Sequence, residues 1–209
     1  MADFSIEASL IKDGYNIIAG IDEAGRGPLA GPVVAAAVIL DINSNLFDKV
    51  DDSKKISEKN RKKLFELIVE NSINYSINAI DNIEIDNINI LNSTMLAMNN
   101  AINDLKIKPD YLLIDGNYFK GNILPYHTVI KGDSISKSIA AASILAKVYR
   151  DKWMVEVADK EFPQYNFAKH KGYATKKHIE LIKKYGICKY HRTSFLGNIL
   201  QPKEIQLFT

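Results

Sequence analysis

The sequence predicts an α/β protein built on a mixed β-sheet. Short apolar runs of strand length alternate with longer stretches whose apolar residues recur at helical spacing. Glycine and proline turn signals separate several of these segments. The expected order is two strands, a helix, a strand, a helix, two strands and a long helix. The 209 residues, 46% of them hydrophobic, suit one domain, or one core with a small appendage.

Five segments have the length and composition of strands. They are residues 16–22, 33–40, 73–80, 111–115 and 127–130. A glycine- and proline-rich turn region at 25–32 joins the first two. Segment 73–80 alternates apolar and polar residues, so we expect a half-exposed strand there. Its apolar face would carry Ile73, Tyr75, Ile77 and Ala79, and its polar face Asn74, Ser76 and Asn78.

Four segments show the apolar spacing of helices. They are residues 57–71, 91–105, 135–157 and 175–185, with approximate ends. Ser57 can cap the first of these helices. The second is marked by Leu91, Met95, Met98, Ile102 and Leu105. The third and longest has one stripe made of Ile135, Ile139, Ala142, Ala146, Tyr149, Trp153 and Val157.

Composition excludes several classes of protein. The single cysteine, Cys188, excludes an internal disulfide and cysteine-rich zinc modules, and it favours a reducing compartment. The first fifteen residues contain three acids and no long apolar run, so they do not resemble a signal peptide. The longest nearly uncharged stretch, 27–40, is interrupted by prolines and is too short to span a bilayer. We therefore expect a cytoplasmic protein without a membrane partner.

Charge is distributed unevenly along the chain. The net charge is only +2, yet residues 169–192 hold eight cations and one anion. Three of the four histidines lie in the same window. The window is either a solvated helix face or a patch that binds a polyanion, and the charge pattern alone leaves both interpretations open.

Carboxylates follow three of the predicted strands. Asp22 and Glu23 come directly after Ile21, Asp115 follows Ile114, and Asp133 follows the last strand. Ligand sites in open α/β sheets lie beyond the carboxyl ends of strands. If segments 16–22 and 111–115 are parallel neighbours, Asp22 and Asp115 end side by side. Each acid alone could be a solvated charge, a turn residue or a helix cap, but three strand ends together favour a metal site.

Such a cluster of like charges is unfavourable unless cations neutralise it. Two like charges 4 Å apart cost about 4 kcal/mol at an effective dielectric constant of about 20. Oxygen ligands without histidine or cysteine favour Mg²⁺ or Mn²⁺. A pair of such ions can cleave a phosphodiester, because one activates water and the other stabilises the leaving oxygen.

Seven segments together resemble the ribonuclease HII family, in the order that the family has them. They are GIDEAGRGPLAGPVV (20–34), DSKK (52–55), LIDG (113–116), KGD (131–133), IAAASILAKVYRD (139–151), KHKGYAT (169–175) and HRTSF (191–195). The resemblance covers residues 15–196, approximately. It implies an RNase H-like fold, with a five-stranded mixed sheet flanked by helices and a small helical C-terminal region. The division implied is a catalytic core at 1–160 and a basic helical region at 161–209 that packs on it.

The resemblance also implies an activity. Members of this family cleave the RNA strand of RNA/DNA hybrids and nick duplex DNA on the 5′ side of a single embedded ribonucleotide, leaving 5′-phosphate and 3′-hydroxyl ends. Asp22, Glu23, Asp115 and Asp133 match the four catalytic acids, which hold two divalent ions, Mg²⁺ or Mn²⁺. Asp22 would bridge both ions, Asp133 would complete the site of the ion that activates water, and Glu23 and Asp115 would hold the other ion.

The position of Glu23 directly after Asp22 raises a geometric question. Side chains alternate along a strand, so both acids can face the ions only if the strand ends or bends there. Gly25 and Gly27 could supply that freedom.

Further matches imply substrate-binding residues. Gly25, Arg26 and Gly27 match the turn that reads the ribose, where glycines let the backbone approach the sugar and its 2′-hydroxyl. Tyr173 matches the tyrosine that stacks on the sugar at the RNA–DNA junction. The remaining expected substrate contacts are Ser53, Lys54, Lys55, Lys147 and Arg192.

Some residues in the C-terminal half are expected to have structural roles. Arg192, together with His191, could be structural instead of binding substrate. Asp151 is expected to pair with a neighbouring cation and not with a metal. The basic window 169–192 would grip the duplex backbone.

Competing hypotheses differ in the role of the acids. A non-catalytic nucleic-acid-binding module would use the basic window alone and would gain nothing from acids beside phosphates. Another two-metal enzyme of the same fold, such as a DNA recombinase nuclease, would cleave duplexes made only of DNA. Ribonuclease HIII is disfavoured because only about fifteen residues precede the first strand, and type 1 ribonuclease H because its first two acids are far apart in sequence.

The last residues suggest one protein partner. The tail 201–208 faintly resembles a sliding-clamp-binding peptide, with Gln201 and a terminal hydrophobic pair. A terminus that packs on the domain is the alternative. Nothing in the sequence requires more than a monomer.

Overall fold

The computed structural model describes residues 2–53, 56–121 and 123–200. Lys54, Lys55 and the tail 201–209, on which three of the expectations above fall, lie outside the described residues. A five-stranded mixed sheet forms the centre of the molecule, in the order β3-β2-β1-β4-β5. Its strands are β1 (Ile18–Ala24), β2 (Val33–Ile39), β3 (Asn74–Ile80), β4 (Tyr111–Asp115) and β5 (Tyr126–Val129). β2 is antiparallel to β1 and β3, whereas β4 is parallel to β1 and β5.

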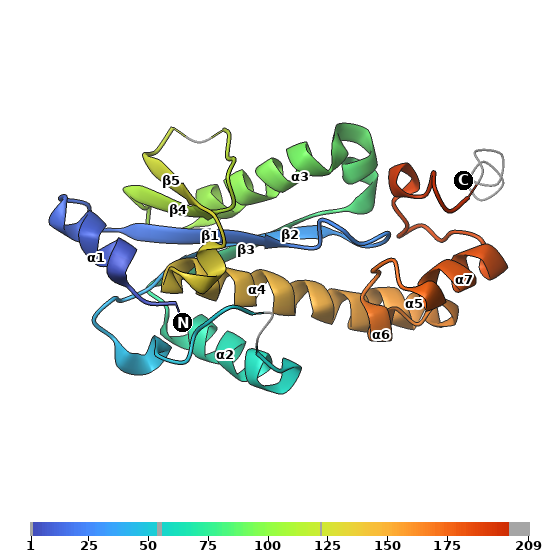
Figure 1. The fold of residues 1–209 in the computed structure, drawn as a ribbon, viewed down its shortest axis with the longest axis horizontal. Helices are drawn as coiled ribbons and strands as arrows, with labels where there is room; N and C mark the ends of the chain where they lie inside the picture. The colour runs from blue at the N-terminus through green and yellow to red at the C-terminus, as the bar shows by residue number, and fades with distance from the viewer. Residues whose placement is uncertain (1, 54–55, 122, 201–209) are drawn as a thin grey trace.

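Helices cover both faces of this sheet (Figure 1). The described helices are α1 (Ser5–Lys12), α2 (Glu58–Asn71), α3 (Asn82–Asp104), α4 (Lys137–Trp153), α5 (Asp159–Glu161), α6 (Phe167–His170) and α7 (Lys176–Tyr185). α3 lies on one face, and α4 with α2 lies on the other. A π-helical turn, Met154–Ala158, extends α4 toward the C-terminal region. The predicted fold class, a mixed sheet flanked by helices, is therefore confirmed.

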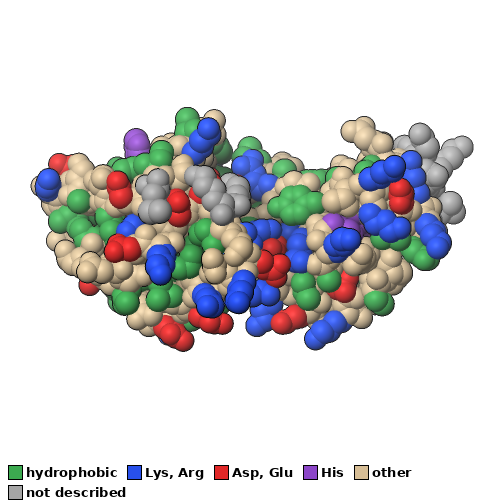
Figure 2. All heavy atoms as spheres, turned by 60° about the horizontal axis from the view of Figure 1, so that its bottom comes forward, with side chains coloured by type: hydrophobic (Ala, Val, Ile, Leu, Met, Phe, Trp, Pro, Cys, Tyr) green, Lys and Arg blue, Asp and Glu red, His purple; other side chains and the backbone are tan. Residues whose placement is uncertain are grey.

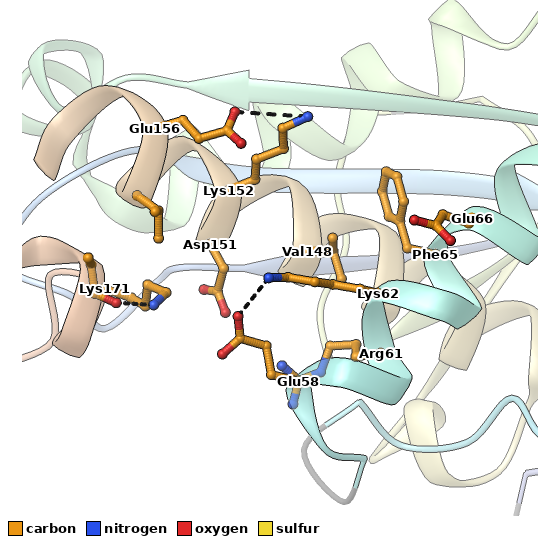
Figure 3. A pocket seen from close by; sticks show the side chains of 12 residues that line it. Glu58, Arg61, Lys62, Phe65, Glu66, Val148, Asp151, Lys152, Glu156 and Lys171 are labelled. Carbon is orange, nitrogen blue, oxygen red and sulfur yellow. Dashed lines mark hydrogen bonds and ion pairs between the residues drawn. The ribbon is translucent and has the colours of Figure 1, made fainter. Parts of the chain in front are cut away.

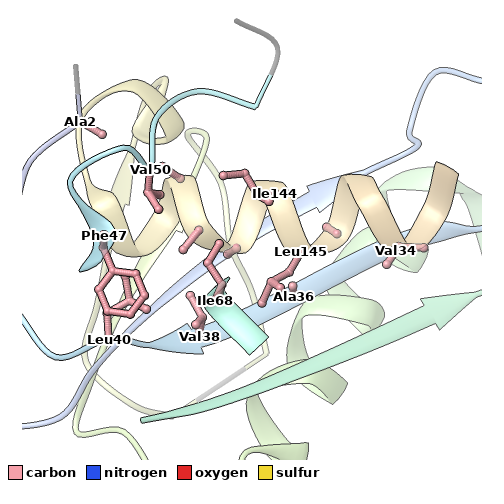
Figure 4. Packing of buried hydrophobic residues seen from close by; sticks show 14 residues of the cluster. Ala2, Val34, Ala36, Val38, Leu40, Phe47, Val50, Ile68, Ile144 and Leu145 are labelled. Carbon is pink, nitrogen blue, oxygen red and sulfur yellow. The ribbon is translucent and has the colours of Figure 1, made fainter. Parts of the chain in front are cut away.

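Separate apolar clusters hold the layers together. Alanines of α4 and Ile68 of α2 pack on Val34, Ala36 and Val38 of β2 (Figure 4). On the other sheet face, Met98 and Ile102 of α3 pack among residues of β1, β2 and β4. A third cluster joins Leu29 and Ala30 to the end of α4 and to α7, so the C-terminal region packs on the turn that follows β1.

Two of the predicted helices begin where their capping residues indicate. Ser57 accepts a hydrogen bond from the Asn60 amide at the start of α2 (3.4 Å), and Thr175 accepts one from the His178 amide at the start of α7 (3.2 Å). Helix α4 differs from its predicted stripe, because nearly all residues of its first half are buried. That half lies between the sheet and α2, so the surrounding elements, and not one apolar face, decide its burial.

The prediction for α3 was too short. The helix begins at Asn82, nine residues before the first residue of the predicted stripe, and Asp81 caps it through the Glu84 amide (2.8 Å). Its first half alternates isoleucine with polar residues and shows no clear helical stripe. Asn89, with a φ of 68°, kinks the helix between the two halves.

The residues of β3 alternate between two faces as predicted, but burial does not follow the apolar face. Ser76 is the buried residue of the strand, whereas Tyr75 and Ala79 are exposed. Helix α3 covers the polar face, where the Ser76 hydroxyl donates to the Ala101 carbonyl and Asn78 accepts from Asn100 (3.3 Å). Alternation in the sequence identified a strand correctly but could not tell which face a neighbouring helix would cover.

The N-terminal helix α1 was not predicted. Its Glu7 is fully buried and accepts hydrogen bonds from the Ser136 hydroxyl (2.6 Å) and the Ser138 amide (3.1 Å). The Glu7 carboxylate thus satisfies hydrogen-bond donors at the start of α4 and so holds α4 against the N-terminal helix α1. Within the described ranges, no helix has the length and apolar character needed to cross a bilayer.

Candidate functional site

Acidic side chains gather at the carboxyl ends of β1 and β4. The two strands are parallel neighbours, with Ile21 paired to Ile114, so Asp22 and Asp115 follow at the same edge of the sheet. The expectation that these two strand ends lie side by side is confirmed. Asp22 is buried, and Asp115 and Glu23 are partly buried.

The strand does not end at Asp22, contrary to one of the two geometries expected. Pairing between β1 and β2 continues through Glu23 and Ala24, and Gly25 follows with a φ of 94°. The Asp22 carboxylate accepts a hydrogen bond from the Glu23 amide (2.7 Å), which holds it back against its own strand. The Glu23 carboxylate lies 3.2 Å from the Arg26 guanidinium.

Burial and mutual repulsion disfavour the charged forms of these acids. Burial, followed by the charges of Glu23 and Asp115, raises the pKa of Asp22 well above its ordinary value. A hydrogen bond from the Ser143 hydroxyl opposes that shift. Burial also raises the pKa of Glu23, against the attraction of Arg26. We call the edge of the sheet that carries Asp22, Glu23 and Asp115 the acid end. The surrounding groups only partly neutralise the negative charge of its carboxylates.

Asp133 lies in a short 3-10 turn, Gly132–Ser134, that leads into α4. The Gly132 amide donates to Asp115 (2.7 Å), so this turn is attached to the end of β4. Ser136, not Asp133, caps α4 by accepting from the Ile139 amide. The interpretation of Asp133 as the cap of α4 is therefore wrong, and its side chain is buried.

The donor set fits hard divalent cations in its chemistry. All four groups are carboxylates, and burial raises the pKa of both Asp22 and Glu23. Across the described residues, no three His, Cys, Asp or Glu side chains already form a cluster that could hold a metal ion. A bound cation would therefore have to draw the carboxylates together and compete with Arg26 for Glu23.

Two buried arginines donate hydrogen bonds to backbone carbonyls of the turn that follows β1. Arg192 donates to the carbonyls of Gly25 (2.7 Å), Arg26 (2.9 Å) and Gly31 (2.8 and 2.9 Å). Arg150 donates to the carbonyls of Ala30 and Pro32. The Arg26 side chain itself is half exposed, so the turn keeps its own guanidinium at the surface.

Tyr173 lies in a loop that is attached to this turn. The Leu29 amide donates to the Gly172 carbonyl (2.8 Å), and the Tyr173 ring is 41% exposed. The Lys147 ammonium lies 5.6 Å from the ring centroid and pairs with Asp151 at 2.8 Å. The prediction that Asp151 pairs with a neighbouring cation is confirmed.

Two of the expected substrate contacts are buried. Ser53 is 3% exposed and its hydroxyl lies 2.9 Å from that of Ser143, while Arg192 is fully buried. Neither side chain reaches solvent, which supports the structural interpretation of Arg192. Ser53, Ser143 and Asp22 instead form a chain of hydrogen bonds beneath the acid end.

Two residues in this arrangement received no role from the sequence, Ser143 and Arg150. Both lie in the segment 139–151 that carries the family resemblance, and that was the available signal. Their positions on α4 place Ser143 near the end of β1 and Arg150 near the turn that follows β1. The spacing of residues along one helix does not reveal these neighbours.

The basic window divides into an exposed and a buried part. Its lysines at 176, 177, 183, 184 and 189 are exposed, mostly on α7. Its histidines, His170, His178 and His191, are buried and contact one another. Lysines are therefore available at the surface for a polyanion, whereas the histidines are part of the core.

A large groove lies between α2 and the end of α4, and its lining includes none of the four acids Asp22, Glu23, Asp115 and Asp133. Its volume is about 550 Å³, and its walls include Phe65 and Val148. Figure 2 shows Lys and Arg side chains around a central hollow of this face. In the groove, cations are matched by acids, as in the pairs Lys62–Glu58 and Lys152–Glu156 (Figure 3). The groove therefore offers little net charge to a phosphate.

Comparisons with known proteins agree with the geometry. The family model described as Ribonuclease HII matches residues 19–197. A curated Ribonuclease HII from Caldicellulosiruptor bescii is 55% identical over 197 residues, which cover 94% of this chain and 95% of that protein.

Solved structures resemble the fold over most of its length. The ribonuclease H2 of Pyrococcus horikoshii matches with a TM-score of 0.72 and 26% identity, covering 92% of this chain and 99% of that chain. The RNase HII of Archaeoglobus fulgidus, solved in a complex with PCNA, matches with a TM-score of 0.71 and 26% identity, covering 85% and 94%.

Proposed function

The chain belongs to the ribonuclease HII family, and from that premise we propose that it nicks duplex DNA on the 5′ side of a single embedded ribonucleotide. Membership makes it a nuclease that acts on the RNA of RNA/DNA hybrids, with the RNase H-like fold. The proposed products carry 5′-phosphate and 3′-hydroxyl ends.

One observation carries the proposal: buried Asp22 and partly buried Asp115 follow paired residues of two parallel strands, beside a turn that presents backbone and Arg26 to the surface. The raised pKa of Asp22, caused by burial and by the neighbouring acids, favours an external source of positive charge. A pure nucleic-acid-binding module would gain nothing from acids in this position, because they repel phosphates.

Asp22, Glu23, Asp115 and Asp133 would hold two divalent cations, Mg²⁺ or Mn²⁺. Such cations supply an activated water and stabilise the leaving oxygen of a phosphodiester. Ser143 orients the Asp22 carboxylate through its hydroxyl, and the Gly132 amide orients Asp115. The chain thus fixes two of the acids before substrate arrives, which reduces reorganisation during the reaction.

Recognition of the ribose would rest on the turn and on Tyr173. Nothing lies within 4 Å of where a Gly27 side chain would begin, so backbone there is open to a sugar. Arg26 can hold a phosphate through two N–H groups. The exposed ring of Tyr173 can stack on the neighbouring sugar, and the lysines of α7 can contact the duplex backbone.

A nicking assay on three matched duplexes tests the proposal. They are an all-DNA duplex, the same duplex with one ribonucleotide, and an RNA/DNA hybrid, each with Mg²⁺ or Mn²⁺. We expect cleavage of the last two only, and Asp22→Asn should reduce it about 1,000-fold, because metal-held charge stabilisation is worth several kcal/mol.

Fluorescence anisotropy with labelled duplex provides the control for this assay. Asp22→Asn should bind about as tightly as the wild type, since the substitution leaves the turn and the basic window intact. Cleavage of the all-DNA duplex would favour the recombinase-type nuclease, and full activity of Asp22→Asn would defeat the role given to the acids.

We also propose that the tail 201–209 can bind a sliding clamp. The RNase HII of Archaeoglobus fulgidus forms a complex with PCNA, and the tail of this chain faintly resembles a clamp-binding peptide. Deleting residues 204–209 should abolish a pull-down by purified clamp. The absence of any pull-down with the intact chain would end this part of the proposal.

A further inference from the structure

Arg150 connects the two elements that would read the ribose. This α4 residue is fully buried, and its guanidinium donates three hydrogen bonds to backbone carbonyls. Nε donates to Pro32 (2.9 Å) and Nη2 to Ala30 (3.0 Å), both in the turn 25–32. Nη1 donates to Lys171 (3.0 Å), two residues before Tyr173. One rigid group thus spans both elements.

The two elements pack closely around that guanidinium. A Cβ on Gly25 would lie 2.1 Å from Arg150 Nε, and a Cβ on Gly172 would lie 2.6 Å from the Ala30 carbonyl oxygen. The Leu29 amide donates directly to Gly172. The Arg150 guanidinium also lies 5.7 Å from the centroid of the Tyr173 ring. Little space is left for the turn to move relative to the tyrosine.

Arg192 shows what is particular to Arg150. Arg192 is equally buried and donates four hydrogen bonds, but all of its acceptors belong to the turn. Arg192 therefore shapes the turn, whereas Arg150 sets its position relative to the loop of Tyr173.

We propose that Arg150 is a positioning residue that fixes the Gly25–Gly27 turn relative to Tyr173 and thereby determines how strictly the enzyme requires a ribose at the cleavage junction. The inference rests on the proposed function, because it assigns the turn and Tyr173 to the same sugar. A lysine cannot replace the arginine, since its single nitrogen cannot reach three separated carbonyls in a fork.

A double-mutant cycle between Arg150→Lys and Tyr173→Ala tests the inference. We measure kcat and KM on the single-ribonucleotide duplex and on the hybrid. In the wild-type background Tyr173→Ala should lower kcat/KM on the single-ribonucleotide duplex about tenfold. In the Arg150→Lys background the same change should cost no more than about twofold, because the tyrosine is already misplaced.

Arg61→Lys is the matched control. The Arg61 guanidinium also donates to two backbone carbonyls, those of Ser53 and Ile56 (both 2.8 Å), and neither belongs to the turn or the tyrosine loop. In this background Tyr173→Ala should retain its full effect. If Tyr173→Ala lowers kcat/KM by the same factor in the Arg150→Lys and Arg61→Lys backgrounds as in the wild type, the inference is overturned.

Hydrogen exchange gives a readout that needs no activity. The Leu29 amide, which joins the turn to Gly172, should exchange at least about tenfold faster in Arg150→Lys than in the wild type. The amides of β2 should be unchanged. Unaltered Leu29 exchange in a folded variant would contradict the bridging role.

The results of these experiments distinguish a failure of this inference from a failure of the proposed function. A wild-type protein that cleaves none of the three duplexes would defeat the proposed function, while exchange at Leu29 would still test the bridge. If Arg150→Lys does not fold, Arg150→Gln takes its place. Failure of both variants to fold would assign Arg150 to folding alone and overturn the inference.

Discussion

Two regions of the molecule bury titratable groups, and burial acts on them in opposite directions. At the acid end of the sheet, burial raises the pKa of Asp22 and Glu23. In the C-terminal region, burial lowers the pKa of His178 to about 4 and of His191 to about 3. In both regions the protein interior favours the neutral form.

The regions differ in how their polar atoms are satisfied. His178 Nδ1 lies 3.0 Å from the Tyr173 carbonyl, its Nε2 lies 3.2 Å from His191 Nε2, and His191 Nδ1 accepts from the Cys188 amide (2.9 Å). His170 stacks on His178 with centroids 4.2 Å apart. The histidine cluster is therefore complete within the chain. At the acid end, by contrast, the neighbouring charges of Glu23 and Asp115 add to the effect of burial and raise the pKa of Asp22 further.

This contrast distinguishes the histidine cluster from the acids that we propose to hold metal ions, without reference to sequence families. Buried polar groups that satisfy one another stabilise a unique packing, whereas buried like charges persist at a stability cost when function requires them. The three predictions below test whether the two regions behave so differently.

Acid should destabilise the protein through the histidine cluster. A histidine whose folded pKa is depressed contributes stability that is complete above its unfolded pKa of about 6.5 and is lost as pH falls toward the folded value. For His178 and His191 together, the loss between pH 7.5 and 5 is at most about 4 kcal/mol. Denaturant unfolding across that range measures it.

Asp22 works against this loss, because a carboxyl group with a raised pKa takes up its proton earlier in the folded state and gains stability as pH falls. The same titration in Asp22→Asn removes one of the two carboxyl groups that oppose the histidines, the other being Glu23, and the loss of stability should be steeper. A free energy of unfolding that stays constant from pH 7.5 to 5 in that variant would remove the histidine cluster from this role.

The sequence correctly predicted that β1 and β4 end side by side, because this placement depends on only two features of the chain. Apolar runs define β1 and β4, and a parallel pair brings Asp22 and Asp115 to one edge. The start of α3 and the faces of β3 were harder to predict, because the choice depends on which element covers Ser76 and Asn78. Local alternation contains no information about that neighbour.

The same reason explains why the burial of Ser53 was not predicted and why the role of Arg192 stayed open. The family resemblance implied substrate contacts for both residues, with a structural role as the alternative for Arg192. Their partners, the Ser143 hydroxyl and the carbonyls of Gly25 and Gly31, are far away in sequence. Carbonyl acceptors in particular belong to every residue, so no side-chain pattern reveals them.

The turn between the two regions offers a matched pair of glycines. Gly25 has a φ of 94°, and a Cβ there would lie 2.1 Å from Arg150. Gly25→Ala should therefore cost about 3 kcal/mol, from backbone strain and overpacking together. Gly27 has open space around its Cα, so Gly27→Ala should change stability by less than about 0.5 kcal/mol.

Activity should rank the two glycines differently from stability. If backbone at Gly27 approaches the ribose, Gly27→Ala lowers cleavage of the single-ribonucleotide duplex while its melting temperature stays near that of the wild type. Thermal denaturation and the nicking assay on the same preparations give both numbers. Equal loss of activity and stability in Gly27→Ala would show that the second glycine is also structural.

The smallest expected effect gives the most direct test of the contrast, because it predicts that removing a functional group stabilises the protein. Asn has the shape of Asp and can still accept from Ser143, but it carries no charge for Glu23 and Asp115 to repel. Because burial and the charges of Glu23 and Asp115 raise the pKa of Asp22, Asp22→Asn should stabilise the protein in chelator at pH 7.5. Adding Mg²⁺ or Mn²⁺ should raise the melting temperature of the wild type, because a cation that binds only the folded state stabilises it. The difference in stability between the wild type and Asp22→Asn should then become smaller. A less stable Asp22→Asn in chelator would mean that the chain already neutralises its acids, and the acid end would then resemble the histidine cluster.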